Sequence, residues 1–184
     1  AARSLRISGS VNDRSGRTDL DLRVKGTEGA TGTLSSKGVR FEVVRVGNDV
    51  YLRTDRAGYV KLAGARGPEL IGDRWLRTGP GDARFSSFEE LTNRDKLIDG
   101  LLSPRGALTK GEATTVRGTP AIALRSADDK GTLAVATTGP PYPLRLASGP
   151  KSDGSGEIDF GEWNAPVTLS TPPPDQVLDT SKLR

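Results

Sequence analysis

The sequence contains no cysteine, no histidine and no methionine, and only 5% of its residues are aromatic. Without cysteine, a disulfide, an iron–sulfur cluster and a thiol nucleophile are excluded from these 184 residues. Without histidine, the chain lacks the commonest metal ligand and the commonest general base. No apolar run approaches the roughly 18 residues that a membrane-spanning helix requires. These absences weaken most hydrolase and metalloenzyme interpretations and favour a protein that binds a partner without catalysis.

The apolar residues that are present are mostly aliphatic. Leu, Val, Ile and Phe make up 41 of the 184 residues, which is enough to form a core that is thin in aromatic rings. The net charge is +4, and the first 80 residues carry 15 basic and 9 acidic side chains. A basic face for anionic partners is one interpretation. We favour basic residues on the solvated side of alternating strands, such as Arg23, Arg40, Arg45 and Arg53.

Alternation of apolar and polar residues dominates the first 55 positions. Leu20, Leu22 and Val24 alternate with charged residues, and similar runs recur around positions 5–11, 39–43 and 50–53. Short turn signals separate the runs, and gaps this short join only neighbouring antiparallel strands. The pattern predicts a five-stranded meander in which each strand has one wet and one buried face.

The rest of the chain predicts an α-helical insertion followed by more strands. Residues 56–73 suggest a short helix and a loop, and residues 74–78 a brief strand. A capping box at 87–90 precedes a helical apolar pattern that ends near Leu102. Further strands are expected at about 108–116, 120–126, 131–137, 142–149 and 155–163. The Pro-rich run at 171–174 predicts an extended tail outside the sheet.

These elements predict a single domain over residues 1–184 of the α+β class. We expect a strongly curled antiparallel half-barrel of about eleven strands, with short helices covering its concave face. A flat two-sheet sandwich is the alternative, but it offers the central helix no obvious surface to pack against.

Two short motifs carry catalytic or metal-binding interpretations, and neither is convincing. Ser148–Lys151 matches a Ser-x-x-Lys pattern, yet Gly and Pro between the two ends preclude the helical turn that this chemistry needs. The acidic residues of 153–159 alternate as calcium ligands do, but strand spacing places them in one solvated row. We therefore expect no catalytic residue, no metal site and no cofactor.

Nine segments, taken in order, resemble one family over nearly the whole chain. They are 1–9, 29–34, 50–53, 73–76, 101–104, 108–112, 141–146, 166–169 and 174–177. Together they are similar to the LppX/LprG-type envelope lipoproteins of actinomycetes, relatives of the LolA and LolB lipoprotein carriers.

The resemblance implies a LolA-like half-barrel with a hydrophobic cavity that binds or carries acylated lipids, glycolipids or lipoproteins across the cell envelope. It also implies tethering at the outer face of the cell membrane by a lipidated cysteine. That cysteine, the signal peptide and most of a first helix are absent from this segment. We expect a monomer, and we expect no nucleic-acid partner because the Arg-rich strands lack interleaved aromatic residues. A protein-interaction or sensor domain of the same fold is the alternative function.

A lipid cavity would be lined by inward-facing strand residues and by the central helix. If these side chains instead pack on one another, they form an ordinary core. The candidate lipid-binding residues are Leu20, Leu22, Val24, Leu34, Phe41, Val43, Leu52, Leu97, Ile98, Leu101, Leu102, Leu133, Val135, Leu144 and Leu146.

Overall fold

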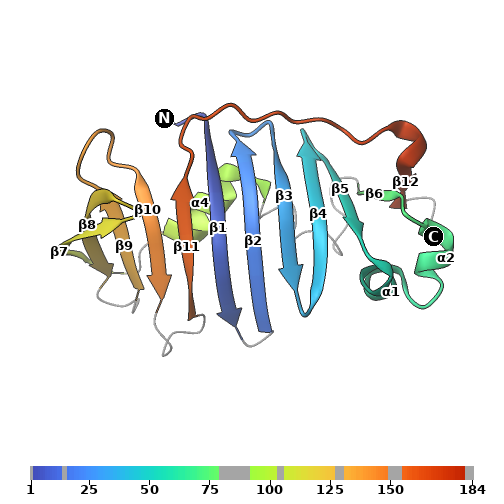
Figure 1. The fold of residues 1–184 in the computed structure, drawn as a ribbon, viewed down its shortest axis with the longest axis horizontal. Coiled ribbons are helices and arrows are strands. Elements are labelled where there is room, and N and C mark those ends of the chain that lie inside the picture. The colour runs from blue at the N-terminus through green and yellow to red at the C-terminus, as the bar shows by residue number, and fades with distance from the viewer. Residues whose placement is uncertain are drawn as a thin grey trace.

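One open sheet of twelve strands makes up most of the protein (Figure 1). The structure is a computed structural model that describes residues 2–13, 16–78, 92–102, 106–126, 131–148 and 155–180. The strand order is β12-β6-β5-β4-β3-β2-β1-β11-β10-β9-β8-β7. The fold is therefore a single mixed sheet with few helices, and its twelve strands exceed the predicted eleven by one.

The predicted meander at the start of the chain is confirmed. Five consecutive strands pair antiparallel: β1 (Ser4–Asp13), β2 (Gly16–Lys25), β3 (Gly29–Ser36), β4 (Val39–Val46) and β5 (Asp49–Thr54). Leu22 lies opposite Ile7 on one side and opposite Gly32 on the other. Because side chains alternate between the faces of a strand, this register brings the apolar members of all five strands to one face.

The last third of the chain adds the other half of the sheet. Its strands are β7 (Leu108–Val116), β8 (Thr119–Ser126), β9 (Gly131–Ala136), β10 (Pro143–Ser148) and β11 (Ser155–Gly161). β11 pairs antiparallel with β1, so the middle of the sheet joins residues that lie about 150 positions apart in the chain. The predicted strands of this region are confirmed to within two residues at each end.

The middle of the chain and its C-terminal tail form the opposite end of the sheet. α1 (Arg56–Ala63) and α2 (Gly67–Ile71) precede β6 (Trp75–Thr78), and a 3-10 turn (Pro174–Gln176) leads into β12 (Val177–Asp179). β12 pairs with β6 in parallel. The prediction of a tail outside the sheet is thus wrong, because the prolines end before the chain returns to the edge of the sheet.

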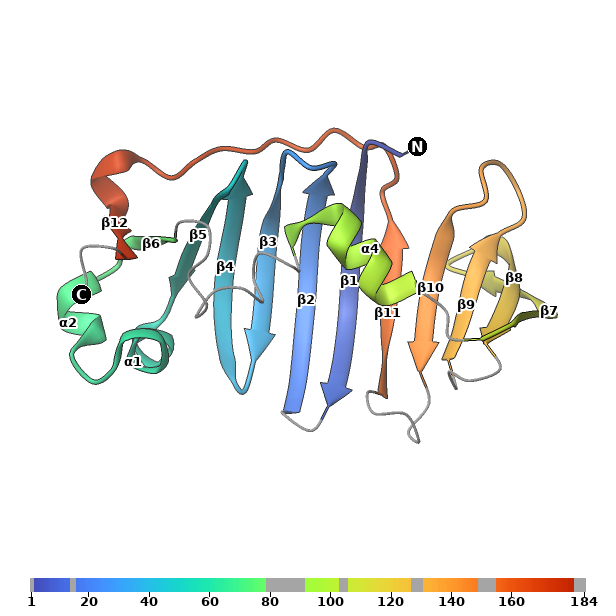
Figure 2. The same ribbon diagram turned by 180° about the vertical axis from the view of Figure 1, so that it is seen from behind.

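The helix α4 (Arg94–Leu102) lies across one face of the sheet, over β2, β1 and β11 (Figure 2). We call this the helix face and the opposite side the open face. Ile98 of α4 packs against a large cluster of buried residues on the helix face. The capping box at 87–90, expected to begin this helix, lies outside the described residues.

Ion pairs cover the open face around β1 and β2. Arg6 donates from Nε and Nη2 to the two carboxylate oxygens of Asp21, both at 2.8 Å. Glu162 accepts from Arg6 at 3.3 Å and from Arg23 at 2.9 Å. Each of these exposed ion pairs contributes little to the free energy of unfolding. Together they make this face of the sheet polar and compatible with water.

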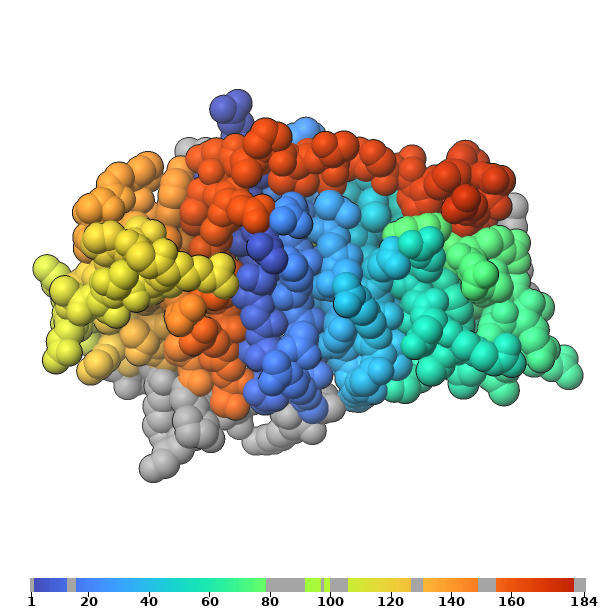
Figure 3. All heavy atoms as spheres, in the orientation of Figure 1, coloured from blue at the N-terminus to red at the C-terminus, as the bar shows by residue number. Residues whose placement is uncertain are grey.

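The β7–β8 hairpin folds over the open face, where it contacts β11 (Figure 3). Arg117 in the hairpin turn and Arg145 on β10 both donate to Asp159, whose side chain is only 11% exposed. Val116 and Ala121 of the hairpin pack with Ala134 of β9 in a small buried cluster on this face.

Gly32 makes the close approach of β2 and β3 possible. A Cβ atom there would lie 2.1 Å from the carbonyl oxygen of Asp21, and φ is +153°. We expect Gly32→Ala to lower the free energy of unfolding by about 2 to 4 kcal/mol, measured by urea titration. Gly161→Ala is the control, since a Cβ at Gly161 meets no atom within 4 Å. Equal stability of the two variants would contradict this account.

Asp21 predicts a pH dependence of stability. The hydrogen bonds from Arg6 lower the pKa of the Asp21 carboxyl below its ordinary value. The pair therefore stabilises the fold fully above about pH 4 and loses this effect as the pH falls through the lowered pKa. Urea titrations between about pH 5 and pH 2 should show a shallower loss of stability for Asp21→Asn than for the wild type. Identical profiles would show that the pair does not act on folding.

Candidate functional site

Seven of the predicted lipid-binding residues lie together in the buried cluster of the helix face. They pack with Leu5, Ile7 and Phe160 and are at most 8% exposed. The seven are Leu20, Leu22, Val24, Leu34, Phe41, Val43 and Leu52. Because these side chains contact one another, they form the packed floor of the helix face, and their role in binding a lipid stays a prediction.

Beyond this floor, a row of half-buried apolar residues continues the helix face across β10, β9 and β8. Leu146 lies opposite Leu133, and Leu133 lies opposite Leu124. Val135, two residues farther along β9, lies opposite Ile122. We call these five residues the apolar strip. All of them keep some exposed surface, so they present apolar atoms that are not fully covered by the described residues.

Ile122 and Leu124 were not among the predicted site residues. Their alternation with Ala121 and Ala123 is a period-two signal in the sequence, and it places both on the same face as Leu133. The signal is weak on its own, because alanine is as common inside a protein as valine or leucine.

The remaining predicted residues fall into two groups. Ile98 contacts the buried cluster, whereas Leu97, Leu101 and Leu102 lie on α4 with side chains outside the described part of the structure. Leu144 is not brought to this site. The pairing of β10 with β9 shifts register between Pro143 and Arg145, and Leu144 packs against the separate cluster of Val116, Ala121 and Ala134.

Arg45 points to the helix face and is 6% exposed, so its expected place on the solvated side of β4 is wrong. Period-two alternation puts it in phase with Val43. Its Nε donates to the carbonyl oxygen of Thr92 at 3.1 Å, Nη1 to that of Gly47 at 2.6 Å, and Nη2 to that of Thr27 at 3.2 Å. One side chain thereby joins two hairpin turns to the segment that enters α4.

A second arginine holds the start of α4. Arg94 Nη1 donates to the carbonyl oxygen of Ala2 at 2.9 Å. Asn93 Oδ1 accepts from the amides of Asp95 and Lys96, which supplies the N-terminal cap of the helix. The first turn of α4 is therefore fixed by polar contacts, while Ile98 contributes the apolar contact with the sheet.

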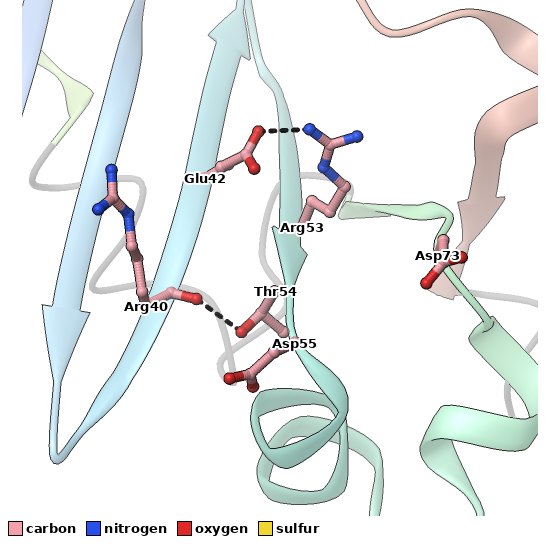
Figure 4. Close-up of a pocket in the computed structure, with 6 residues that line it drawn as sticks. All are labelled: Arg40, Glu42, Arg53, Thr54, Asp55 and Asp73. Atoms are coloured by element: carbon pink, nitrogen blue, oxygen red, sulfur yellow. Dashed lines mark hydrogen bonds and ion pairs between the residues drawn. The ribbon is translucent and has the colours of Figure 1, made fainter.

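A polar cleft of about 470 Å³ opens next to α1 (Figure 4). Arg53 donates to Glu42 at 2.7 Å across its wall and lies 4.7 Å from the ring centre of Trp75. Five charged side chains and a hydroxyl line this cleft, so it suits a polar ligand better than a hydrocarbon chain. Its lining residues are Arg40, Glu42, Arg53, Thr54, Asp55 and Asp73.

Within the described ranges, no three acidic, histidine or cysteine side chains gather as a metal site would require. Asp159, a member of the acidic row at 153–159, is bound by two arginines. The helices of the described residues include none with the length and apolar character to span a membrane.

Comparisons with known proteins place the fold. No family model matches the sequence, and no curated protein matches it. Among solved structures, LprF from Mycobacterium bovis is similar with a TM-score of 0.62 and 16% identity, covering 94% of this chain and 90% of that one. The lipoprotein LppX of Mycobacterium tuberculosis is similar with a TM-score of 0.56 and 15% identity, covering 92% and 91%. The resemblance expected from the sequence is confirmed at the level of the fold: this chain folds as the mycobacterial proteins LprF and LppX do.

Proposed function

We propose that the protein binds the acyl chain of a lipid or acylated glycolipid along the apolar strip, beside α4. The observation that carries this proposal is the strip itself, a continuous row of half-buried aliphatic side chains on the face that the helix covers. The fold shared with the lipoprotein LppX supports the same function. We further propose that the curled sheet and its helices act as a half-barrel of the LolA type.

The energetics of this binding need no reactive group. Each methylene removed from water contributes roughly 0.8 kcal/mol, so a dozen contribute on the order of 10 kcal/mol before ordering costs. The packed floor lies in the same sheet as the strip and is built before a chain binds, so the protein loses little freedom on binding. We propose that the protein moves or holds lipid in the cell envelope without catalysis. We further propose that it acts as a monomer tethered by an N-terminal lipid anchor.

Uptake of a fluorescent fatty acid tests the strip. Val135→Gln places an amide where the acyl chain would lie, and burying an unpaired amide costs about 1 to 3 kcal/mol. We therefore expect about tenfold weaker uptake, measured by fluorescence titration. Val44→Gln is the matched control, because Val44 is also half-buried but pairs with Tyr51 and Thr31 on the open face. Equal uptake by the wild type and both variants would exclude the strip as the site.

Protein purified from its native source provides an independent test. We expect its organic extract to contain one class of acylated lipid in mass spectrometry, and Val135→Gln protein to contain less of it. Extracts without lipid would contradict the proposal.

A protein-interaction domain is the second candidate, and the edge strand β7 favours it. Seven of the nine residues from Leu108 to Val116 are exposed, and β7 has one neighbour in the sheet, β8. A partner strand could add to this edge. A lipid-free extract, together with binding to a protein partner that is abolished by Thr115→Pro, would favour this function over lipid binding. The carbonyl oxygen of Pro120, opposite Thr115, accepts from the amide of Thr137 at the end of β9, which leaves the Thr115 amide on the free edge.

Arg45 generates a prediction about α4. Arg45→Met removes a guanidinium donor from the carbonyl oxygens of Thr92, Gly47 and Thr27. We expect a loss of about 2 to 4 kcal/mol in unfolding free energy and faster amide hydrogen exchange in α4, measured by urea titration and mass spectrometry. Arg40→Met on the exposed side of the same strand is the control and should change stability by less than about 0.5 kcal/mol. Unaltered exchange in α4 would show that Arg45 does not hold the helix.

A further inference from the structure

The helices α1 and α2 form a corner of the molecule at the β5–β6 end of the sheet, opposite the β7 edge (Figures 1 and 3). Two of the three large apolar side chains exposed in the described structure lie on this corner. Val60 on α1 is 41% exposed and Leu70 on α2 is 56% exposed. Each of the two helices therefore presents one large aliphatic side chain to solvent in the described part of the structure.

The corner is rigidly built, so both side chains project from a fixed support. A Cβ on Gly67 would lie 2.5 Å from the carbonyl oxygen of Tyr59, which shows how closely α2 approaches α1. Tyr59 Oη donates to the carbonyl oxygen of Arg74 at 2.6 Å, and Tyr59 packs with Ile71 and Leu76. The inner sides of both helices are thus used for packing, and their outer sides face solvent.

Exposed basic residues outnumber exposed acidic residues on this corner. Arg56, Lys61 and Arg66 are exposed on the two helices and the turn between them, and Asp55, Glu69 and Asp73 carry the negative charges there. Lys61 Nζ donates to the carbonyl oxygen of Lys37, which brings a fourth exposed cation to the same corner. We call Lys37, α1, α2 and the turn between the helices the basic corner.

We propose that the basic corner docks the protein on an anionic membrane surface. The cations attract acidic lipid headgroups, and Val60 and Leu70 enter the boundary between headgroups and acyl chains. This pairing of cations with apolar side chains is what binding at a membrane interface requires. Docking is independent of the apolar strip, because the two surfaces share no residue.

Co-sedimentation with vesicles tests the proposal. The full chain should bind vesicles of phosphatidylglycerol and phosphatidylcholine in equal parts, and bind pure phosphatidylcholine at least tenfold more weakly. Leu70→Glu should weaken binding to the mixed vesicles about tenfold or more, because a negative charge replaces an aliphatic side chain that would enter the bilayer interface. Leu108→Glu is the matched control: Leu108 is 51% exposed on β7, far from the corner, and its variant should bind as the wild type does.

Charge is tested separately. Each cation near an acidic bilayer contributes about fivefold in affinity, so Arg56→Gln with Arg66→Gln should weaken binding by at least tenfold. Replacing Arg17 and Arg125, which are exposed elsewhere on the sheet, should have less effect. Circular dichroism and thermal midpoints check that every variant is folded.

Two results would overturn docking. The first is that the wild-type protein stays in the supernatant with mixed vesicles, whether or not it binds an oligonucleotide. The second is that Leu70→Glu binds these vesicles as tightly as Leu108→Glu does. The Val135→Gln variant separates the two proposals. It should dock normally while taking up fatty acid poorly, so either function can fail without the other.

Discussion

An open sheet with one apolar face must keep that face out of water, and the rest of this structure follows from that constraint. Register across β1 to β5 and β11 gathers the aliphatic side chains on one side, and α4 is placed over them. Two arginines secure the helix through backbone carbonyl oxygens, since an apolar contact at Ile98 fixes neither its direction nor its start. The opposite side carries ion pairs around β1 and β2, and its far end is covered by the β7–β8 hairpin.

Strands were predictable where the period-two pattern and short turns act locally, as in β1 to β5. The return of the chain at β12 was not, because its pairing with β6 joins residues about 100 positions apart and leaves no local signal. Arg45 was predicted on the solvated side of β4 because it is charged, although its position is in phase with the buried Phe41 and Val43. Leu144 shows the converse, since a register shift that no residue pattern announces moves it away from Leu146.

The face occupied by most of the predicted site residues could be predicted from the sequence, but the depth at which each one lies could not. Sequence alternation tells which side of the sheet a residue occupies, but not how deeply it is covered. Leu22 and Val135 have the same pattern, yet Leu22 is fully buried and Val135 is half-buried. The difference comes from the elements stacked above each strand. The half-buried apolar residues of this face therefore include those of β8 to β10, whereas seven of the predicted residues lie in the buried floor.

The pairing of β1 with β11 has a consequence for how the chain acquires its shape during synthesis. β1 lies at the centre of the sheet, but its neighbour β11 is translated only about 150 residues later. Until then the hairpins of the first half carry an unfinished edge, which invites association with other chains. Nascent protein should therefore depend on chaperones until its C-terminal third has emerged, and shortened products should aggregate.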